Sequence, residues 1–262
     1  MNLKNKVVLV TGASSGLGEQ ICYEAAKKGA IVIVCARRIQ LIGQVKENCS
    51  MLSQNEAYAF QLDVSDPQSI ERMYAKVKEE IGTVDYLVND AGFGYFADFV
   101  SFEQEKIREM FEVNVLGLML LTQRVASDML KASSGHIINI ASMAGKMATP
   151  KSSVYSATKF AVLGFSNALR LELKPFGIAV TTVNPGPIRT EFFAKADPSG
   201  SYLQNVDAFV INPNKLAGKI VKQMNHPKRE INQPLIMEFA ARAYQLFPKV
   251  GDFLAGGIFN QK

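Results

Sequence analysis

Short apolar segments alternate with longer amphipathic segments along most of this chain of 262 residues. The apolar segments are rich in Val and Ile and end at polar residues or glycine, which is the pattern of buried strands. The longer segments repeat apolar residues every three or four positions, which predicts helices. Strands are expected at residues 6–10, 31–36, 57–62, 84–89, 136–141 and 178–184. Helices are expected at residues 19–28 and 39–50, from Pro67 onward, and at residues 102–131, 155–173 and 213–224.

This alternation predicts a doubly wound parallel sheet of the Rossmann type, an α/β fold with helices on both faces and ligands at the carboxyl ends of the strands. A hydrophobic content of 48% supplies one large core. Neither an internal repeat nor a low-complexity linker divides the chain, so we expect a single dinucleotide-binding and catalytic domain over residues 1–262. Two helix starts are marked by polar residues before prolines, Ser65 or Asp66 before Pro67 and Asn212 before Pro213.

Two C-terminal segments depart from the alternation. Residues 191–225 are expected to form a flap over the substrate followed by a helix, because a turn interrupts a run of aromatic residues there. These aromatic residues are Phe192, Phe193, Tyr202 and Phe209. Residues 235–262 are expected to form an apolar extension with two helical faces separated by Pro248. One face carries Ile236, Phe239, Ala240, Ala243 and Phe247, and the other carries Val250, Phe253, Leu254 and Ile258.

Three accounts of this extension are open. It could pack against the domain's own sheet, contact another subunit in a homodimer or homotetramer, or attach to a membrane surface. Lys249 and Lys262 favour the membrane account, whereas Glu238 and Asp252 count against it. The subunit account predicts that removal of residues 236–262 yields a monomer.

Composition excludes several classes of protein. No apolar run reaches 18 residues, so no transmembrane helix is expected. Residues 1–6 lead directly into the first strand and leave no room for a signal peptide. Cys22, Cys35 and Cys49 are too few for a disulfide framework, and a reducing cytoplasm is the expected location. The net charge of +5 is modest and the basic residues are dispersed, so nucleic acid is not expected as a partner. No metal site is predicted.

Ser142, Tyr155 and Lys159 form the first candidate site. Tyr155 and Lys159 are four residues apart in a predicted helix and therefore lie on one face, while Ser142 follows a predicted strand. An ammonium about 4 Å from a phenol favours the phenolate by roughly 4 kcal/mol at an effective dielectric of about 20, an upper bound of about 3 pK units. Such a tyrosine can exchange a proton with an alcohol or carbonyl oxygen, which Ser142 would also hold. For these residues alone, a surface Tyr and Lys on an amphipathic helix is an equal alternative.

A glycine-rich segment, Gly12-Ala13-Ser14-Ser15-Gly16-Leu17-Gly18, joins the first predicted strand to the first predicted helix. Glycines in such a turn let the backbone approach a pyrophosphate, whose charge then lies at the helix N-terminus. The spacing is G-x-x-x-G-x-G, which differs from the G-x-G-x-x-G of many dinucleotide folds. The order of strand, glycine loop and helix nevertheless predicts a bound dinucleotide.

These motifs together resemble those of the short-chain dehydrogenases/reductases in their single-domain form, over roughly residues 5–190. The segment from Thr11 to Gly18 resembles the family's cofactor loop, and Pro185-Gly186 its nicotinamide-side loop. Asn89-Asp90-Ala91-Gly92 resembles its N-N-A-G turn, with a departure at Asp90 that is expected to matter little. The family's catalytic tetrad matches Asn114, Ser142, Tyr155 and Lys159.

The second predicted strand ends in Ala36-Arg37-Arg38, where NAD-preferring folds carry an acid for the ribose 2′-hydroxyl. Guanidinium groups pair well with phosphate, so this strand end favours NADP; a solvated Arg pair opening a helix is the alternative. Asp63-Val64 resembles the family's adenine contact. The resemblance implies that the cofactor is held by Gly12, Ser14, Ser15, Gly16, Leu17, Gly18, Arg37, Arg38, Asp63, Val64, Asn89, Ala91, Gly92, Tyr155, Lys159, Pro185, Gly186, Ile188 and Thr190.

The resemblance implies an NADPH-dependent oxidoreductase that interconverts a carbonyl and an alcohol by hydride transfer. Tyr155 would donate the proton and Ser142 would orient the oxygen. Lys159 would lower the pKa of Tyr155 and hold the nicotinamide ribose, and Asn114 would break its helix and complete a proton relay. The aromatic flap favours an apolar ketone or aldehyde as the small-molecule substrate. Two alternatives are a 3-oxoacyl-carrier-protein reductase and a non-catalytic NADP-binding regulator.

Overall fold

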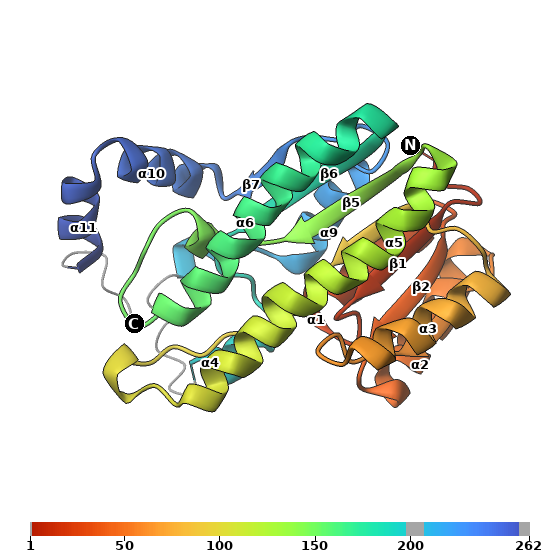
Figure 1. The fold of residues 1–262 in the computed structure, drawn as a ribbon, viewed down its shortest axis with the longest axis horizontal. Coiled ribbons are helices and arrows are strands. Elements are labelled where there is room, and N and C mark those ends of the chain that lie inside the picture. The colour runs from red at the N-terminus through yellow and green to blue at the C-terminus, as the bar shows by residue number, and fades with distance from the viewer. Residues whose placement is uncertain (1, 198–206, 257–262) are drawn as a thin grey trace.

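A computed structural model describes residues 2–197 and 207–256 of the chain. Its centre is a seven-stranded sheet in the order β3-β2-β1-β4-β5-β6-β7, and all neighbouring strands are parallel (Figure 1). The strands are β1 Val7–Thr11, β2 Ile31–Ala36, β3 Tyr58–Gln61, β4 Tyr86–Asn89, β5 Gly135–Ile140, β6 Ile178–Pro185 and β7 Glu230–Gln233. The predicted doubly wound α/β fold is therefore confirmed.

The chain changes direction across the sheet between β1 and β4. From β1 it adds β2 and β3 on one side, and it then returns to place β4 on the other side of β1. Val8 pairs with Tyr86 and Val10 with Val88 at this junction. The loops that follow β1 and β4 lead to helices on opposite faces, and such a switch point opens a crevice at the carboxyl ends of the strands.

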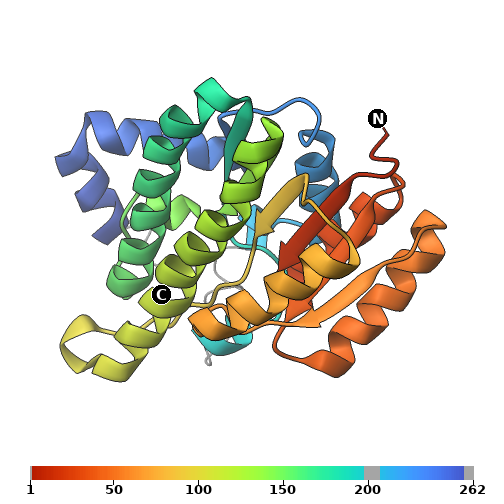
Figure 2. The ribbon, with the colours of Figure 1, turned by 45° about the vertical axis from the view of Figure 1, so that its right-hand side comes forward.

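Helices cover both faces of the sheet, as the two views in Figures 1 and 2 show. Their bounds are α1 Gly16–Ala26, α2 Ile39–Ser53, α3 Pro67–Glu80, α5 Leu118–Ala132, α6 Ser153–Leu173 and α9 Pro213–Lys222. α1, α2 and α9 share one core with the sheet, which includes Val8 and Leu216. α3, α5 and α6 contribute to the core on the other face, which includes Leu9 and Leu121. Neighbouring residues of β1 thus point to opposite cores, as the two-residue period of a strand requires.

The prediction of a single helix at residues 102–131 is wrong in detail. The structure divides it into α4 Gln104–Phe111, a π-helical segment Glu112–Gly117 and α5. A Cβ on Gly117 would lie 2.3 Å from the backbone oxygen of Val64, so glycine allows the wider turn to pack tightly against the loop after β3. The expected local break at Asn114 is therefore present as a π-helical turn.

Two further details concern strand and helix ends. β7 was not predicted, because three of its four residues are polar and Ile231 is its buried residue. It pairs with the last residues of β6 and extends the sheet. Both predicted helix starts are confirmed: the Asp66 side chain accepts from the backbone N–H of Gln68, and Asn212 accepts from that of Asn214.

The apolar extension forms two helices, α10 Leu235–Leu246 and α11 Pro248–Gly256, which lie at one end of the molecule beyond β7 (Figure 1). Among its described residues Ala241 is buried, whereas Phe239 is 70% exposed, Leu246 74% and Phe253 74%. Packing of both faces against the domain's own sheet is therefore wrong. Ile258 lies outside the described residues, as does Tyr202 of the flap. Among the helices of the described chain, none is long and apolar enough to cross a membrane.

Candidate active site

A cavity of about 810 Å³ opens at the carboxyl edge of the sheet, where the loops after β1 and β4 diverge. Its walls also include segments that follow β2, β3, β5 and β6, together with the start of α6. Many of the predicted site residues line it: Gly12, Ser14, Ser15, Gly16, Leu17, Arg37, Arg38, Asp63, Val64, Ala91, Gly92, Ser142, Tyr155, Lys159, Pro185, Gly186, Ile188 and Thr190. Gly18, Asn89 and Asn114 are buried next to the wall instead.

The glycine loop between β1 and α1 is shaped by close backbone contacts. Gly12 has a φ of 68°, and a Cβ there would lie 2.8 Å from the backbone nitrogen of Ala91. Gly16 has a φ of 65°, and a Cβ there would lie 3.3 Å from the Thr190 side chain. A larger residue at either position would be strained and would fill the cavity wall. Because α1 begins at Gly16, the backbone N–H groups of its first turn have no partner within the helix and can hold an anion.

The end of β2 supplies the cationic side of the cavity. Arg38 Nη2 donates to the hydroxyl of Ser14 at 2.9 Å and to that of Ser15 at 2.7 Å. Arg38 also forms an ion pair of 3.7 Å with Glu191 at the start of the flap. The strand itself ends at Ala36, so Glu191 is the acid that pairs with Arg38 here. This end of the cavity can therefore pair with a phosphate.

Asp63 has a local partner as well as a place in the cavity wall. Its carboxylate accepts from the backbone N–H of Ser65 at 3.0 Å and from the Ser65 hydroxyl at 2.6 Å. These bonds fix the Asp63 side chain in the turn that precedes α3. The turn role and the predicted contact with an adenine are thus compatible with one conformation.

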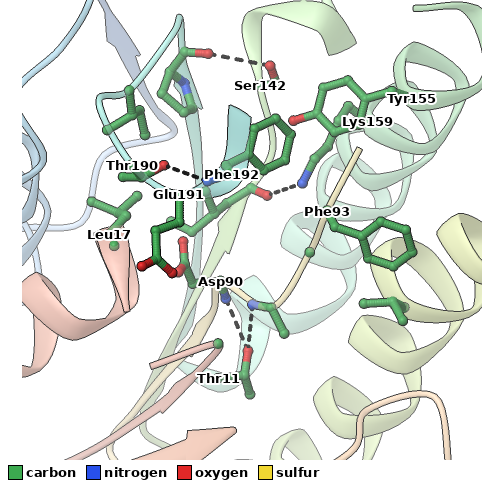
Figure 3. Close-up of a pocket in the computed structure, with 18 of the residues that line it drawn as sticks. Thr11, Leu17, Asp90, Phe93, Ser142, Tyr155, Lys159, Thr190, Glu191 and Phe192 are labelled. Carbon is green, nitrogen blue, oxygen red and sulfur yellow. Dashed lines mark hydrogen bonds between the residues drawn. The ribbon is translucent and has the colours of Figure 1, made fainter. Parts of the chain in front are cut away.

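The turn after β4 packs under the glycine loop. The Thr11 hydroxyl accepts from the backbone N–H groups of Asp90 and Ala91, both at 3.1 Å, as Figure 3 shows. Asn89 is buried and donates to Thr122 and Asn139, so it holds the sheet and does not reach the cavity. Asp90 borders the cavity and is partly exposed, and desolvation of its carboxyl group by the surrounding protein raises its pKa to about 7.

Ser142 and Tyr155 meet at the carboxyl end of β5. The Ser142 hydroxyl accepts from the backbone N–H of Ala144 at 3.1 Å and lies 3.4 Å from the backbone oxygen of Pro185. Tyr155 is buried in the first turn of α6, and Figure 3 shows its hydroxyl pointing toward Ser142. A carbonyl oxygen placed between these hydroxyls could accept a hydrogen bond from each.

Lys159 lies one turn after Tyr155 on the same face of α6. Its Nζ donates to the backbone oxygen of Ile140 at 2.9 Å and lies 5.8 Å from the centroid of the Tyr155 ring. Burial lowers the pKa of Lys159 to about 8, an effect that the Asp90 carboxylate opposes. At neutral pH Lys159 is therefore mainly an ammonium, and its buried position strengthens its field on the phenol.

Asn114 supports the site from within the π-helical segment. Its Oδ1 accepts from the backbone N–H of Phe93 at 3.0 Å, and its Nδ2 donates to the Phe93 oxygen at 2.8 Å and to Thr158 Oγ1 at 3.2 Å. The Asn114 side chain therefore ties the loop after β4 to α6. This fixes the wall that faces Tyr155.

Aromatic side chains form the opposite end of the cavity from the Arg38 end. The Tyr155 ring centroid lies 6.0 Å from that of Phe96 and 5.6 Å from that of Phe192. Phe193 lies 5.1 Å from Phe192 and 6.3 Å from Phe96 by the same measure. Phe192 and Phe193 of the predicted flap therefore line the cavity, whereas Phe209 is not part of its wall.

Sequence reasoning missed several lining residues, namely Phe93, Tyr95, Phe96, Met147, Thr149 and Met237. The first three directly follow the turn after β4, and that position was a usable signal because loops at strand carboxyl ends face the ligand. Met237 belongs to α10, and its sulfur would lie 2.6 Å from a Cβ on Gly186. No pattern in the sequence marks that contact.

Comparison with known proteins identifies the class of protein to which this site belongs. The family model described as short chain dehydrogenase matches residues 6–199. The chain belongs to the short-chain dehydrogenase/reductase family and is an oxidoreductase.

Three similar proteins extend this comparison. A Drosophila melanogaster protein named dehydrogenase/reductase SDR family protein 7-like is 37% identical, over 84% of this chain and 70% of the relative. Farnesol dehydrogenase of Aedes aegypti is 36% identical, over 75% of this chain and 83% of the relative. A short-chain dehydrogenase from Sphingobium yanoikuyae, solved in complex with NADPH, superposes with a TM-score of 0.80 at 26% identity, over 94% of this chain and 96% of that one.

Proposed function

We propose that this protein is an NADPH-dependent reductase of apolar ketones or aldehydes, or the reverse alcohol dehydrogenase. The observation that carries the proposal is that Ser142, Tyr155 and the Lys159 ammonium line one cavity together with the cationic end of β2. An oxidoreductase of this family needs both parts of the cavity, one for the reacting oxygen and one for the phosphates of a dinucleotide.

The residues present fit a nicotinamide dinucleotide. Gly12 and Gly16 keep the loop free of side chains where a Cβ would collide or crowd, and the first turn of α1 offers backbone N–H groups to a diphosphate. Pro185 beside Ser142, Thr190 beside Gly16, and Gly186 and Ile188 all border the cavity, and this segment would hold the nicotinamide side of the cofactor. When bound, the cofactor supplies the hydride.

The chain's own residues supply the proton. Tyr155 donates it to the carbonyl oxygen, and Ser142 orients that oxygen by a hydrogen bond. The Lys159 ammonium favours the phenolate that remains, because the two groups share a buried helix face. Asn114 holds Thr158 and the Phe93 backbone, and through them the position of α6. We propose that it also helps to relay the proton.

The preference for NADP rests on Arg37 and Arg38. Arg38 is already held against Ser14 and Ser15, so a 2′-phosphate between these groups would find preorganised donors. The Sphingobium yanoikuyae structure was solved with NADPH, which agrees with this preference in a similar protein.

The apolar substrate class rests on the aromatic end of the cavity. Phe96 and Phe192 lie against the Tyr155 ring, Phe193 packs against Phe96, and these rings offer little to a charged compound. The similar Aedes aegypti protein is named a farnesol dehydrogenase, and farnesol is an apolar alcohol.

We also propose that the protein is a homo-oligomer in which a second copy covers α10 and α11. Symmetric association is the commonest way in which soluble proteins bury such apolar surface, and Phe239, Leu246 and Phe253 provide it here. The cytoplasm is the proposed location, because the three cysteines are buried free thiols.

One turnover assay tests the reaction and the substrate class. The purified protein is given NADPH or NADH with a series of ketones and aldehydes and with a 3-oxoacyl thioester on a carrier protein. We expect NADPH to be oxidised with apolar carbonyl compounds, at rates that rise with hydrophobic size. Selective use of the carrier-bound thioester would instead identify a 3-oxoacyl-carrier-protein reductase. Binding of NADPH without turnover of any compound would support a regulator.

A further inference from the structure

Asp90 is the position at which the turn after β4 departs from the N-N-A-G pattern. Its backbone N–H is fixed by Thr11, and its carboxyl group points to the first turn of α1. The carboxyl oxygen Oδ2 lies 2.7 Å from the place that a Cβ on Gly18 would take, and the backbone N–H of Gly18 donates to the carboxyl group. The group is therefore held close to the N-terminus of the helix.

A carboxylate at this place conflicts with a diphosphate. The backbone N–H groups at the start of α1 are the natural ligands of the cofactor's pyrophosphate, and Asp90 borders the same cavity. Two negative groups near one helix end repel each other, the more so where water is excluded. A protonated carboxyl group removes this repulsion and can still accept a hydrogen bond from Gly18.

The surroundings of Asp90 have opposing effects on the pKa of its carboxyl group. Among the described residues, the charged or titratable groups that act on it or feel its charge are the Lys159 ammonium of α6 and the Cys22 thiol of α1. Burial raises the pKa of Asp90 to about 7, with Lys159 and the Gly18 N–H opposing that rise. Near neutral pH both protonation states of the free protein are populated.

We propose that Asp90 takes up a proton from solvent when the dinucleotide binds, so that cofactor affinity falls as the pH rises through neutrality. The bound phosphates favour the neutral acid by their charge, and the bound dinucleotide displaces water that would stabilise the anion. This inference rests on the proposed binding of a nicotinamide dinucleotide. It makes Asp90 a positioning and regulatory residue of the cofactor site, distinct from the proton donor Tyr155.

Isothermal titration calorimetry of the full chain with NADPH tests the inference. At pH 7.0, in two buffers that differ in ionisation enthalpy, wild type should take up about half a proton for each cofactor bound. Asp90→Asn, which keeps the shape and is neutral, should take up close to none. Across pH 6.0–7.5 the wild-type Kd should rise about threefold or more, while the variant changes less than about twofold. The pKa of Lys159, about 8, keeps that group mainly protonated in this range.

Three controls isolate Asp90. Asp85→Asn makes the same change just before β4, at the opposite edge of the sheet, and should leave the proton uptake as in wild type. Asp90→Ser, a smaller neutral residue, should behave like Asp90→Asn. Titration with NADH, which lacks the 2′-phosphate, should show the same proton uptake as NADPH. Binding without proton uptake, or equal uptake by wild type and Asp90→Asn, would overturn the inference alone. If neither dinucleotide bound, the proposed function would fail and the inference with it.

A second readout needs no cofactor. A carboxyl group with a raised pKa stabilises the folded state below its unfolded value near 3.8, and this contribution is lost as the pH rises to about 7. Asp90→Asn has no such loss. The melting temperature of the variant should therefore gain about 4 °C or more on that of wild type between pH 4.5 and 7.5. A constant difference over this range would overturn the inference.

Discussion

The two ends of the cavity are built in different ways. At the Arg38 end, backbone N–H groups, two glycines and short polar side chains come from β1, α1 and β2, which are neighbours in the sequence. At the Tyr155 end, aromatic rings come from the loop after β4, from α6 and from the flap after β6, which are far apart in the chain. The first end is fixed by backbone geometry, whereas the second is fixed by packing of large side chains. Packing of this kind can vary without loss of the fold.

This contrast suggests a division of tasks. The cofactor is the same compound in every turnover, and a wall of backbone groups suits its phosphates. Substrates differ, and the aromatic end can change in size by single substitutions. Substitutions of Tyr155, of residues at each end and of residues outside the cavity should therefore have effects on activity that differ in kind as well as in size.

The largest effect is expected from substitution of Tyr155 itself. Tyr155→Phe removes the hydroxyl that points toward Ser142 and keeps the ring against Phe96 and Phe192. The rate of carbonyl reduction should fall about a thousandfold, since general acid catalysis contributes about 10²–10⁴-fold. Fluorescence titration should show that NADPH still binds within a few-fold of wild type. Residual turnover above a tenth of wild type would show that Tyr155 is not the acid.

The second-largest effect is expected at the cationic end of the cavity and should concern the choice of cofactor. Replacing Arg37 and Arg38 together by Gln should raise the KM for NADPH at least tenfold and leave that for NADH little changed, because charge-assisted bonds to phosphate contribute roughly 1.5–3 kcal/mol. Arg72→Gln, an exposed arginine paired with Asp66 outside the cavity, is the matched control. A wild-type preference for NADH would contradict the assignment of this end.

A smaller effect is expected at the aromatic end. Phe192→Ala should lower kcat/KM for bulky apolar ketones about tenfold and leave that for small ketones within about twofold, because the lost contact area matters for large substrates alone. Phe209→Ala, an aromatic residue of the same segment that is outside the cavity wall, is the control and should change neither value. A clear preference of wild type for small, charged 2-oxo acids would contradict an apolar end.

The smallest effect on the cavity is expected from the extension. Phe239→Ser with Phe253→Ser should leave the Kd for NADPH within about twofold, while light scattering shows a dimer or tetramer dissociating into monomers. These substitutions replace the deletion of residues 236–262, because the deletion would also remove Met237 from the cavity wall. Monomeric wild-type protein at micromolar concentration would contradict the subunit contact. Sedimentation with anionic liposomes would then test attachment to a membrane surface.

The same contrast decides what the sequence could predict. The glycine loop, the Arg pair and the tetrad residues are local patterns, and the structure places most of them in one cavity wall. The parallel sheet with helices on both faces follows from the alternation of strands and helices. Both predictions depend on patterns within short stretches of sequence, and a single sequence is enough to show such patterns.

Long-range packing explains what the sequence did not predict. β7 is too short and too polar to be recognised as a strand in the sequence, and it forms by pairing with the edge of β6. The sulfur of Met237 approaches Gly186 through tertiary contact alone. The motif comparison predicted little effect of the acid at position 90. The position of this carboxyl group beside Gly18, with its raised pKa, gives a reason to revise that expectation.

The pairing of β1 with β4 also governs when the site can form during synthesis. Thr11 is made early, but the N–H groups that it holds belong to Asp90 and Ala91, which leave the ribosome much later. Closing so long a loop is costly in chain entropy and slow to occur. A nascent chain that ends before Tyr86 thus carries the complete glycine motif and its contacts with Arg38, but it lacks the turn after β4 against which Gly12 packs. The phosphate-binding end is encoded first and assembled late, so the growing protein is without a cofactor pocket until the second half of the sheet begins to form.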